Sequence, residues 1–260
     1  MTTPKEVVDL VKGSGNNFHA KVARWFQSDG WHTTISPYYM DQTQNKAREI
    51  DLIAEKSWPI ENIFGHWQGD VVVRLFIECK YVPSYSVFWF TDKHQGEAHK
   101  LVCSSGIFPD SNQYTNKHHY LVHSPKVAKL FASNVQKGQE LEPFYKALNQ
   151  ALNALVSMRY KPSLLPQVQK SRGAVVALDF PVVVCSSFER LWGVDFFAEA
   201  EPQQLTENFQ LEVRYAYADA NGTSRDDYFL LDFVEFNQLS AFAEAIAEDA
   251  KVAAYMSSES

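Results

Sequence analysis

The segment from Asp70 to Tyr81 has the pattern of a central β-strand, and it strongly limits the folds open to this chain. Its apolar and β-branched side chains run almost without a break, which is typical of a strand with neighbours on both sides. Side chains alternate between the two faces of a strand, so Glu78 and Lys80 project from the same face. The alternate apolar residues project from the other face; they are Val73, Leu75, Ile77 and Cys79. Charged side chains in a central strand are rarely idle, and this pair is therefore a candidate site.

Helical and extended patterns alternate around this strand, and we find no internal repeat, low-complexity tract or clear linker. The sequence therefore predicts one α/β domain over residues 1–260. The predicted helices are Asn16–Ser28, Lys126–Asn134, Glu142–Arg159 and Leu239–Ala254. The other predicted strands are Trp31–Pro37, Arg48–Glu55, His119–Val122, Ala174–Cys185 (one or two strands), Phe209–Ala218 and Asp227–Phe236, with a turn at Asp41–Lys46 and a polar loop at Lys161–Gly173.

Cysteine usage and the apolar segments indicate where the chain works. Three widely spaced cysteines without a CxxC pair argue against a disulfide framework and a cysteine-based zinc site, and they fit a reducing cytoplasm. The first residues lack the features of a secretory signal. The longest apolar stretch, Ala174–Cys185, is interrupted by Asp179 and Pro181 and is too short to span a bilayer, so we expect a cytoplasmic protein without membrane contact.

A second acid lies in an apolar setting within the preceding predicted strand, in the run Ile50-Asp51-Leu52. If the two strands pair, Asp51 can lie beside Glu78 and Lys80. Two carboxylates can hold a Mg²⁺ ion, which keeps several waters and takes other ligands from a substrate phosphate. The main-chain carbonyl of Cys79 is within reach of the same ion. Such an ion activates water for phosphodiester hydrolysis, and Lys80 could orient that water or stabilise charge in the transition state.

The order helix, strand, Ile50-Asp51-Leu52 and then Ile77-Glu78-Cys79-Lys80 resembles the PD-(D/E)xK, or restriction-endonuclease-like, nuclease superfamily, in particular its Mrr-like and Holliday-resolvase-like branches. The segment from Gly15 to Trp31 resembles the first helix of that family. The resemblance covers about residues 15–130 and implies a mixed four-stranded sheet flanked by helices, with residues from about 160 to 260 as a C-terminal extension of strands and a helix.

In function, the resemblance implies a metal-dependent endodeoxyribonuclease from a prokaryotic restriction or defence setting. Asp51 and Glu78 would bind Mg²⁺ or Mn²⁺, and Lys80 would assist catalysis. Two departures from the family stand out. His19 occupies the position where the first helix often carries a metal-binding Glu, and it is a poor ligand for Mg²⁺, so we keep it as an additional candidate only. Ile50 stands where the family often has Pro.

Two other function classes stay open. The first is a catalytically degenerate restriction-like fold that acts as a nucleic-acid-binding or regulatory module. The net charge of −7 supports it, because proteins that bind nucleic acid are usually basic, although a local basic groove or a bound ion can compensate. The second is a structural α/β subunit. The sequence leaves open DNA or RNA as substrate, and whether the last hundred residues complete the sheet, form a homodimer or read a target.

Several of these polar residues could have structural roles only. Glu78 and Lys80 could form a surface ion pair, and Asp51 could be a structural acid at a strand end, but we favour the site. Arg48 is expected to face solvent, and Asp232 to be solvated or an ion-pair partner. Five histidines follow no spacing known for zinc ligands, and only a distant cysteine, Cys103, could join them, so we expect no zinc site; they are His94, His99, His118, His119 and His123.

Overall fold

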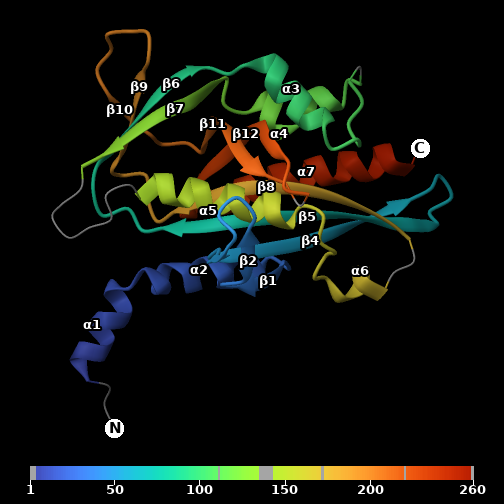
Figure 1. The fold of residues 1–260 in the computed structure, drawn as a ribbon, viewed down its shortest axis with the longest axis horizontal. Helices are drawn as coiled ribbons and strands as arrows, with labels where there is room; N and C mark the ends of the chain where they lie inside the picture. Colours follow the sequence, from blue (N-terminus) through green and yellow to red (C-terminus); the bar gives the residue numbers. More distant parts are fainter. Residues whose placement is uncertain (1–3, 111, 135–142, 171–172, 220, 259–260) are drawn as a thin grey trace.

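The computed structural model describes residues 4–110, 112–134, 143–170, 173–219 and 221–258. It is a mixed α/β structure in which one large sheet carries helices on both faces (Figure 1). Within these residues, no helix is both long and apolar enough to cross a membrane. The helices are α1 (Lys5–Gly13), α2 (Gly15–Ser28), α3 (Gln95–Cys103), α4 (His119–Val122), α5 (Pro143–Met158), α6 (Pro166–Lys170) and α7 (Leu239–Ser258), with 3₁₀ turns η1 (Thr115–Lys117) and η2 (Phe236–Gln238).

The main sheet has ten strands in the order β1-β4-β5-β8-β12-β11-β7-β6-β9-β10, and β2 and β3 form a separate hairpin. The strands are β1 (His32–Ile35), β2 (Tyr38–Asp41), β3 (Lys46–Glu49), β4 (Leu52–Glu61), β5 (Trp67–Lys80), β6 (Ser86–Asp92), β7 (Lys126–Ser133), β8 (Ala174–Cys185), β9 (Leu191–Asp195), β10 (Gln203–Gln204), β11 (Phe209–Ala218) and β12 (Ser224–Glu235).

Strand β5 lies in the interior of the sheet and is buried on both faces. Val73, Leu75 and Ile77 join the core that α2, α3 and α7 cover, as the alternation predicts. Phe76, on the other face, joins the core beneath α5. In Figure 1, α5 and α7 lie along opposite sides of the sheet. The face that carries Glu78 is therefore the face that α5 covers.

Four neighbouring strands, β1, β4, β5 and β8, surround the candidate site. Strand β4 runs antiparallel to its two neighbours, β1 and β5. Strand β8 runs parallel to β5 and follows it in the chain after helix α5. Arg74 of β5 fixes this crossover. Its guanidinium binds Asp179 of β8 at 2.6 Å and donates hydrogen bonds to the carbonyls of Met158, Arg159 and Lys161, where α5 ends. It thereby caps the carbonyls that the helix leaves without partners.

The sheet is joined in its middle by a short seam. Strands β8 and β12 pair only from Val182 to Cys185 and from Asp232 to Glu235. Upstream of the seam the two strands diverge, and a cavity of about 310 Å³ is lined by residues 177–181 of β8 and by Phe229 and Leu230 of β12. Strands β1, β4, β5 and β8 therefore form one part of the sheet, which this short row of pairs joins to the other part, where β7 and β11 in turn share only the pair Ala128–Leu211.

Most of the periodic elements are confirmed. Helices α2, α5 and α7 and strands β1, β5, β8, β11 and β12 occupy the expected segments, with small shifts at their ends. Residue 142, the predicted start of the third helix, lies outside the described residues. The long stretch between Asp51 and Glu78 is an extension of β4 and β5, which pair as far as Glu61 and Trp67. The predicted polar loop from Lys161 to Gly173 contains the short helix α6.

The single strand predicted from Arg48 to Glu55 is wrong. The chain leaves the β2–β3 hairpin at Glu49 and enters the main sheet at Leu52, so it changes partners at Ile50 and Asp51. The backbone hydrogen bonds of this step go to the segment before β2: Ile50 N–H donates to Pro37 O, and Ser36 N–H donates to Asp51 O. Asp51 therefore lies immediately before a strand and not within one.

Two further predictions are reversed. Lys126–Ser133 is the strand β7 and not a helix, because it pairs with β6 and β11, which lie far away in the sequence. Ser124, just before this segment, has a φ of 51°, which is not the extended conformation of a helix N-cap. His119–Val122 is the helix α4 and not a strand, and the Nδ1 atom of His118 caps it by accepting from Tyr120 N–H.

Candidate functional site

Asp51 and Glu78 meet where β4 begins beside β5. Leu52 pairs with Ile77, so the residues on either side of this pair face each other across the two strands. The Oδ2 atom of Asp51 accepts a hydrogen bond of 2.8 Å from Cys79 N–H. The Oε1 atom of Glu78 accepts one of 3.3 Å from Asp51 N–H. Each acid thus binds the main chain of the other strand, and the two carboxylates are held at the same point of the sheet.

Glu78 is a buried acid whose charge is poorly compensated. Only 2% of its surface is exposed. Burial and, next, the charge of Asp51 raise the pKa of Glu78 to about 8, although Lys80 and Lys146 oppose this shift. Without a further cation, the carboxyl group therefore holds its proton at neutral pH. A site of this kind gains from any positive charge that binds between the two acids.

Lys80 and the carbonyl of Cys79 lie at the same place. Lys80 is half-buried, and its positive charge lowers the pKa of Glu78, so the two groups lie close enough to interact. The N–H and C=O groups of one strand residue project to the same side of the strand. Cys79 N–H points toward Asp51, so the Cys79 carbonyl also lies on the β4 side. The structure thus brings together Asp51, Glu78, Lys80 and this carbonyl.

Sequence reasoning missed Lys146. This residue lies on α5, on the face of the sheet that carries Glu78, and its charge lowers the pKa of that acid. A signal for it existed, because Lys146, Asn149, Gln150 and Asn153 recur at helical spacing as a polar stripe on a largely apolar helix. All four line a pocket of about 580 Å³ between α5, the β2–β3 hairpin and β11.

The same pocket contains Arg48, which was expected to face solvent. Arg48 is half-buried, and its Nε atom binds Asp41 at 2.6 Å. Asp41 is fully buried and also accepts a hydrogen bond from Asn153. The β2–β3 hairpin is thereby attached to α5. Arg214 also lines the pocket, but its guanidinium binds Glu97 of α3 at 3.3 Å, so the charged groups of the pocket are Lys146 and the Arg48–Asp41 pair.

His19 is placed apart from the two acids. It lies on α2, which packs against the Ile77 face of β5, whereas Glu78 projects from the opposite face. Its Nε2 atom is buried and has no hydrogen-bond partner among the described residues, so this nitrogen binds neither carboxylate. The role of His19 as an additional ligand stays a prediction.

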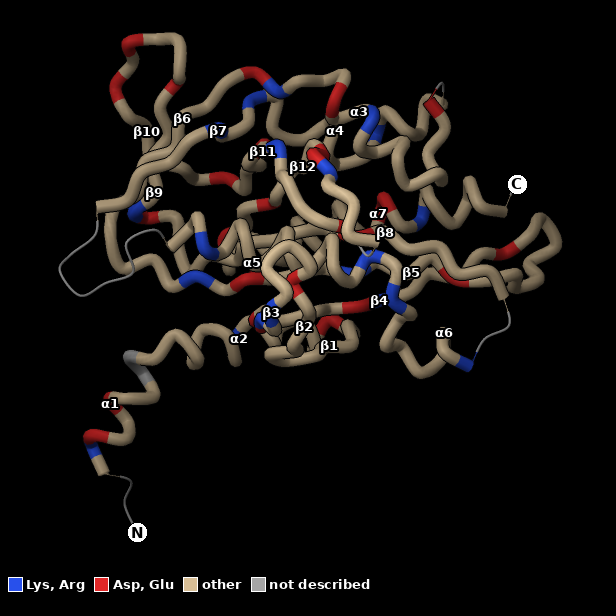
Figure 2. Tube along the Cα trace, viewed as in Figure 1, with Lys and Arg blue, Asp and Glu red and all other residues tan. Residues whose placement is uncertain are grey.

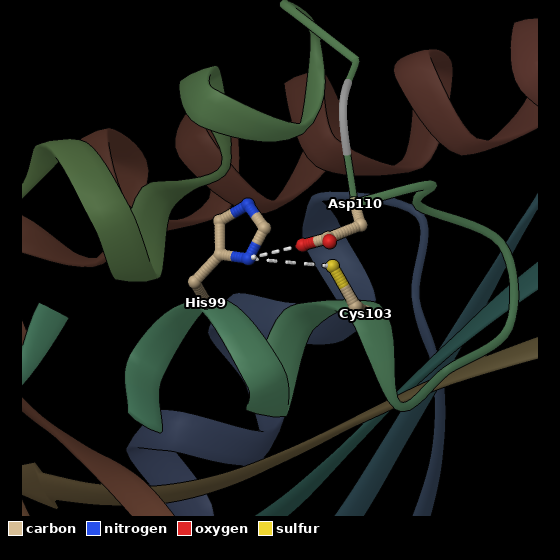
Figure 3. A group of neighbouring side chains, drawn as sticks. All are labelled: His99, Cys103 and Asp110. Atoms are coloured by element: carbon tan, nitrogen blue, oxygen red, sulfur yellow. Dashed lines mark hydrogen bonds and ion pairs between the residues drawn. The ribbon is translucent and has the colours of Figure 1, made fainter. Parts of the chain in front are cut away.

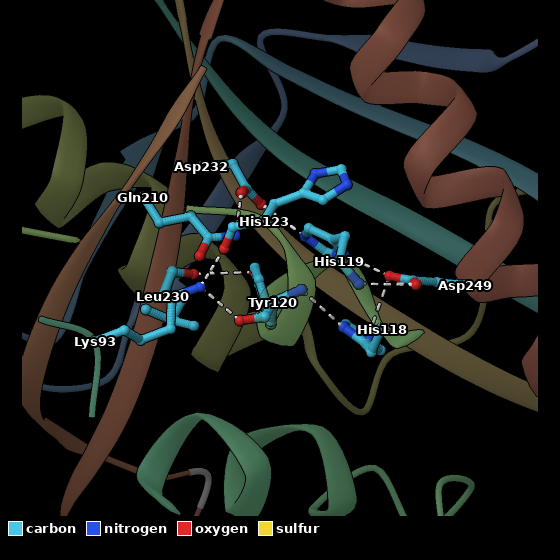
Figure 4. A network of polar contacts seen from close by, with 9 residues as sticks. All are labelled: Lys93, His118, His119, Tyr120, His123, Gln210, Leu230, Asp232 and Asp249. Carbon is cyan, nitrogen blue, oxygen red and sulfur yellow. Dashed lines mark hydrogen bonds and ion pairs between the residues drawn. The ribbon is translucent and has the colours of Figure 1, made fainter. Parts of the chain in front are cut away.

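A second buried polar group lies on the far face of the sheet, around α4 (Figure 4). His119 contacts Asp249 of α7 through Nδ1 and Asp232 of β12 through Nε2, the latter at 3.3 Å. Burial lowers the pKa of His119, but the charges of Asp249 and Asp232 outweigh it and raise the pKa to about 9. Burial lowers the pKa of His118 to about 3. Asp232 is thus an ion-pair partner, as one of the alternatives predicted, and it is not solvated.

The two clusters therefore have different environments and lie on opposite faces of one sheet. The histidine network is closed by its own hydrogen bonds, whereas at Glu78 burial and Asp51 outweigh the two lysines and leave the pKa raised. Comparisons of this chain with known protein families, with curated proteins and with solved structures found no match.

Proposed function

We infer that this protein is a nuclease that uses Mg²⁺ or Mn²⁺ to hydrolyse phosphodiester bonds, with DNA as its substrate. The observation that carries the proposal is the pair of main-chain hydrogen bonds through which Asp51 and Glu78 hold each other's strands. They fix two acids at one point, next to the amine of Lys80. Lys80 and Lys146 compensate the charge of the buried Glu78 carboxyl only in part, since its pKa stays raised to about 8, and a divalent cation would add to their effect.

The donor atoms fit such an ion. Asp51, Glu78 and the carbonyl of Cys79 offer oxygen only, which is the ligand type that Mg²⁺ and Mn²⁺ take in proteins. The thiol of Cys79 packs against the opposite core and does not enter the set. When bound, the ion would supply a polarised phosphoryl oxygen and a water of lowered pKa.

The remaining groups have roles that follow from their positions. Lys80 shares the face of Glu78 and can hold the attacking water or stabilise the negative charge that develops on the phosphate. Lys146, on α5, faces the same acid from the adjacent pocket and can bind a flanking phosphate. Both amines also favour the charged form of Glu78, because their charges lower its pKa.

Substrate binding has to be local, because the whole chain is acidic. Figure 2 shows basic and acidic positions interspersed along the trace of the described residues. The pocket beside the site offers Lys146 and Arg48, the latter paired with Asp41, whereas the guanidinium of Arg214 binds Glu97 of α3. A phosphate backbone that lies along α5 would meet these cations before it reaches Asp51 and Glu78.

The order of the elements also supports the proposal. Helix α2 and the strands β1, β4 and β5 follow the order that the resemblance implies, but the fourth strand of this part of the sheet, β8, comes from the predicted C-terminal extension and not from residues 15–130. On the same basis we propose a restriction-endonuclease-like core, a cytoplasmic location and a role in prokaryotic defence. The C-terminal strands complete the sheet, and dimer formation stays a prediction.

One observation favours a second candidate function, a degenerate module that binds nucleic acid without cutting it. Glu78 is 2% exposed and has a pKa of about 8, so a proton competes with any cation for this group at neutral pH. His19, in place of the family's acid, removes one further ligand.

Cleavage of supercoiled plasmid separates these functions. We expect nicking that requires Mg²⁺ or Mn²⁺ and is lost in Asp51→Ala and in Lys80→Ala. Glu61→Ala, an exposed acid at the other end of β4, is the matched control and should cut normally. DNA retention that neither substitution changes, without any cleavage, would support the module. A protein that neither cuts nor retains DNA at low salt would contradict both.

A further inference from the structure

Three different metal-binding side chains converge beside α3, on the face of the sheet opposite Glu78 (Figure 3). His99 and Cys103 lie one turn apart on α3, and Asp110 reaches them from the segment that follows the helix. The Nδ1 atom of His99 is 3.2 Å from Asp110 Oδ1 and 3.7 Å from Cys103 Sγ. The three ligand atoms all lie within 4.8 Å of one another. Cys103 is therefore a neighbour of one of the five histidines, His99.

These separations are those of ligands around a tetrahedral ion. A zinc ion binds histidine nitrogen and carboxylate oxygen at about 2.0–2.2 Å and thiolate sulfur at about 2.3 Å, so tetrahedral angles place N and O about 3.3 Å apart and N and S about 3.6 Å apart. The observed distances of 3.2 and 3.7 Å differ from these values by about 0.1 Å. Two of the three separations therefore already match those of an occupied site, and the third, between the Asp110 oxygen and the Cys103 sulfur, is at most 4.8 Å.

A cysteine nucleophile fits the group poorly. In a relay of that kind, one ring nitrogen binds the thiol and the other binds the acid. Here, both contacts are made by the same atom, Nδ1 of His99, so the acid cannot orient the ring for a proton transfer to the sulfur.

The buried group of His118, His119 and Asp249 also satisfies the distance criterion, but its atoms are already used. Nδ1 of His118 accepts from Tyr120 N–H, and its Nε2 lies 3.3 Å from Asp249. Both nitrogens of His119 bind carboxylates. Every ring nitrogen of these two histidines thus already has a hydrogen-bond partner. The group beside α3, by contrast, has an exposed acid and a half-buried thiol.

We propose that His99, Cys103 and Asp110 form a binding site for a transition-metal ion of the zinc class, separate from the Asp51–Glu78 site. Nitrogen, sulfur and oxygen donors together select Zn²⁺ over Mg²⁺. Three protein ligands leave a fourth position for water, and Asp110 is 92% exposed, so the site is open to solvent. A bound ion would attach the segment after α3 to that helix, because Asp110 is the one ligand outside α3.

The test is a cobalt titration of the full chain after removal of metals by a chelator. One equivalent of Co²⁺ should give the near-ultraviolet thiolate-to-cobalt absorption of a tetrahedral site, and Zn²⁺ but not excess Mg²⁺ should remove it. Cys103→Ser should abolish the band. Asp110→Ala, at an exposed position, should weaken Zn²⁺ binding at least about tenfold, because even indirect partners of a metal site cost about that much.

Two controls make the test specific. His66→Ala removes an exposed histidine elsewhere, and Asp51→Ala disables the proposed nuclease site; both should keep the band and the Zn²⁺ affinity. The proposal is wrong if the unmodified chain gives no band, if Cys103→Ser retains it, or if Asp110→Ala binds Zn²⁺ as tightly as His66→Ala. Loss of the band in Asp51→Ala alone would instead assign the metal to the nuclease site.

Discussion

Replacing Glu78 with glutamine should stabilise the metal-free protein, and the gain should grow with pH. The substitution keeps the shape of the side chain and the oxygen that accepts from Asp51 N–H, but it removes the charge. Burial and Asp51 raise the pKa of Glu78 from 4.5 to about 8, so the folded state holds this proton more tightly than the unfolded chain. The stability that follows from the proton is complete below about pH 4.5 and is lost as the pH rises through about 8.

The magnitude follows from the two pKa values. Each unit of pH between them costs the folded protein about 1.4 kcal/mol, so the cost is about 3 kcal/mol at pH 7 and approaches 5 kcal/mol above pH 8. Glu78→Gln escapes this cost. It should match the parent protein near pH 4 and exceed it by up to about 3 kcal/mol at pH 7, or roughly 6–10 °C in Tm for a chain of this size.

Urea denaturation in EDTA at pH 5, 7 and 9 measures this difference. Glu61→Gln, at the exposed end of β4, is the control and should follow the parent protein at every pH. Mg²⁺ should also bind the parent protein more tightly as the pH rises toward 8, by up to about tenfold per unit, since the ion has to displace the proton. Parallel stability curves for Glu78→Gln and the parent protein between pH 5 and 9 would refute the reasoning.

Three further expectations follow from the contacts. Lys146→Ala should weaken DNA binding and lower the slope of log affinity against log salt by about one, which filter binding at several salt concentrations measures, and an unchanged slope would remove Lys146 from the interface. Arg74→Met should cost about 3–5 kcal/mol in urea denaturation, because Asp179 and the carbonyls at the end of α5 lose a buried partner, and a loss below about 1 kcal/mol would contradict this role. Proton NMR should show that His119 titrates near pH 9, since Asp249 and Asp232 outweigh its burial, and that stability falls as the pH rises through this value, whereas a midpoint near 6.5 would contradict the ion pairs.

The part of the site that could be predicted from the sequence is the part that depends on strand alternation. Glu78 and Lys80 had to share a face, and Asp51 could join them as soon as its strand paired with β5. The detail that failed was local. Asp51 precedes β4 because the chain changes partners there, and the alternation from Arg48 to Glu55 continues through that break.

Contacts between distant segments account for the rest. Whether Lys126–Ser133 forms a strand depends on β6 and β11, and no property of these eight residues reveals those partners. Lys146 lies more than sixty residues beyond Glu78, and the two meet only because α5 crosses the sheet there. Cys103 and His99 were near in sequence, but Asp110 joins them through the path of an irregular segment.

The short seam between β8 and β12 has a mechanical consequence for the candidate centre. Lys80 pairs with Cys185, and Cys185 pairs with Glu235, so the row that joins the two parts of the sheet passes through the site. If one part rotates against the other, this row is the pivot, and groups at a pivot move least. The opening between the diverging strands would widen or narrow, while the two acids and the amine would keep their spacing.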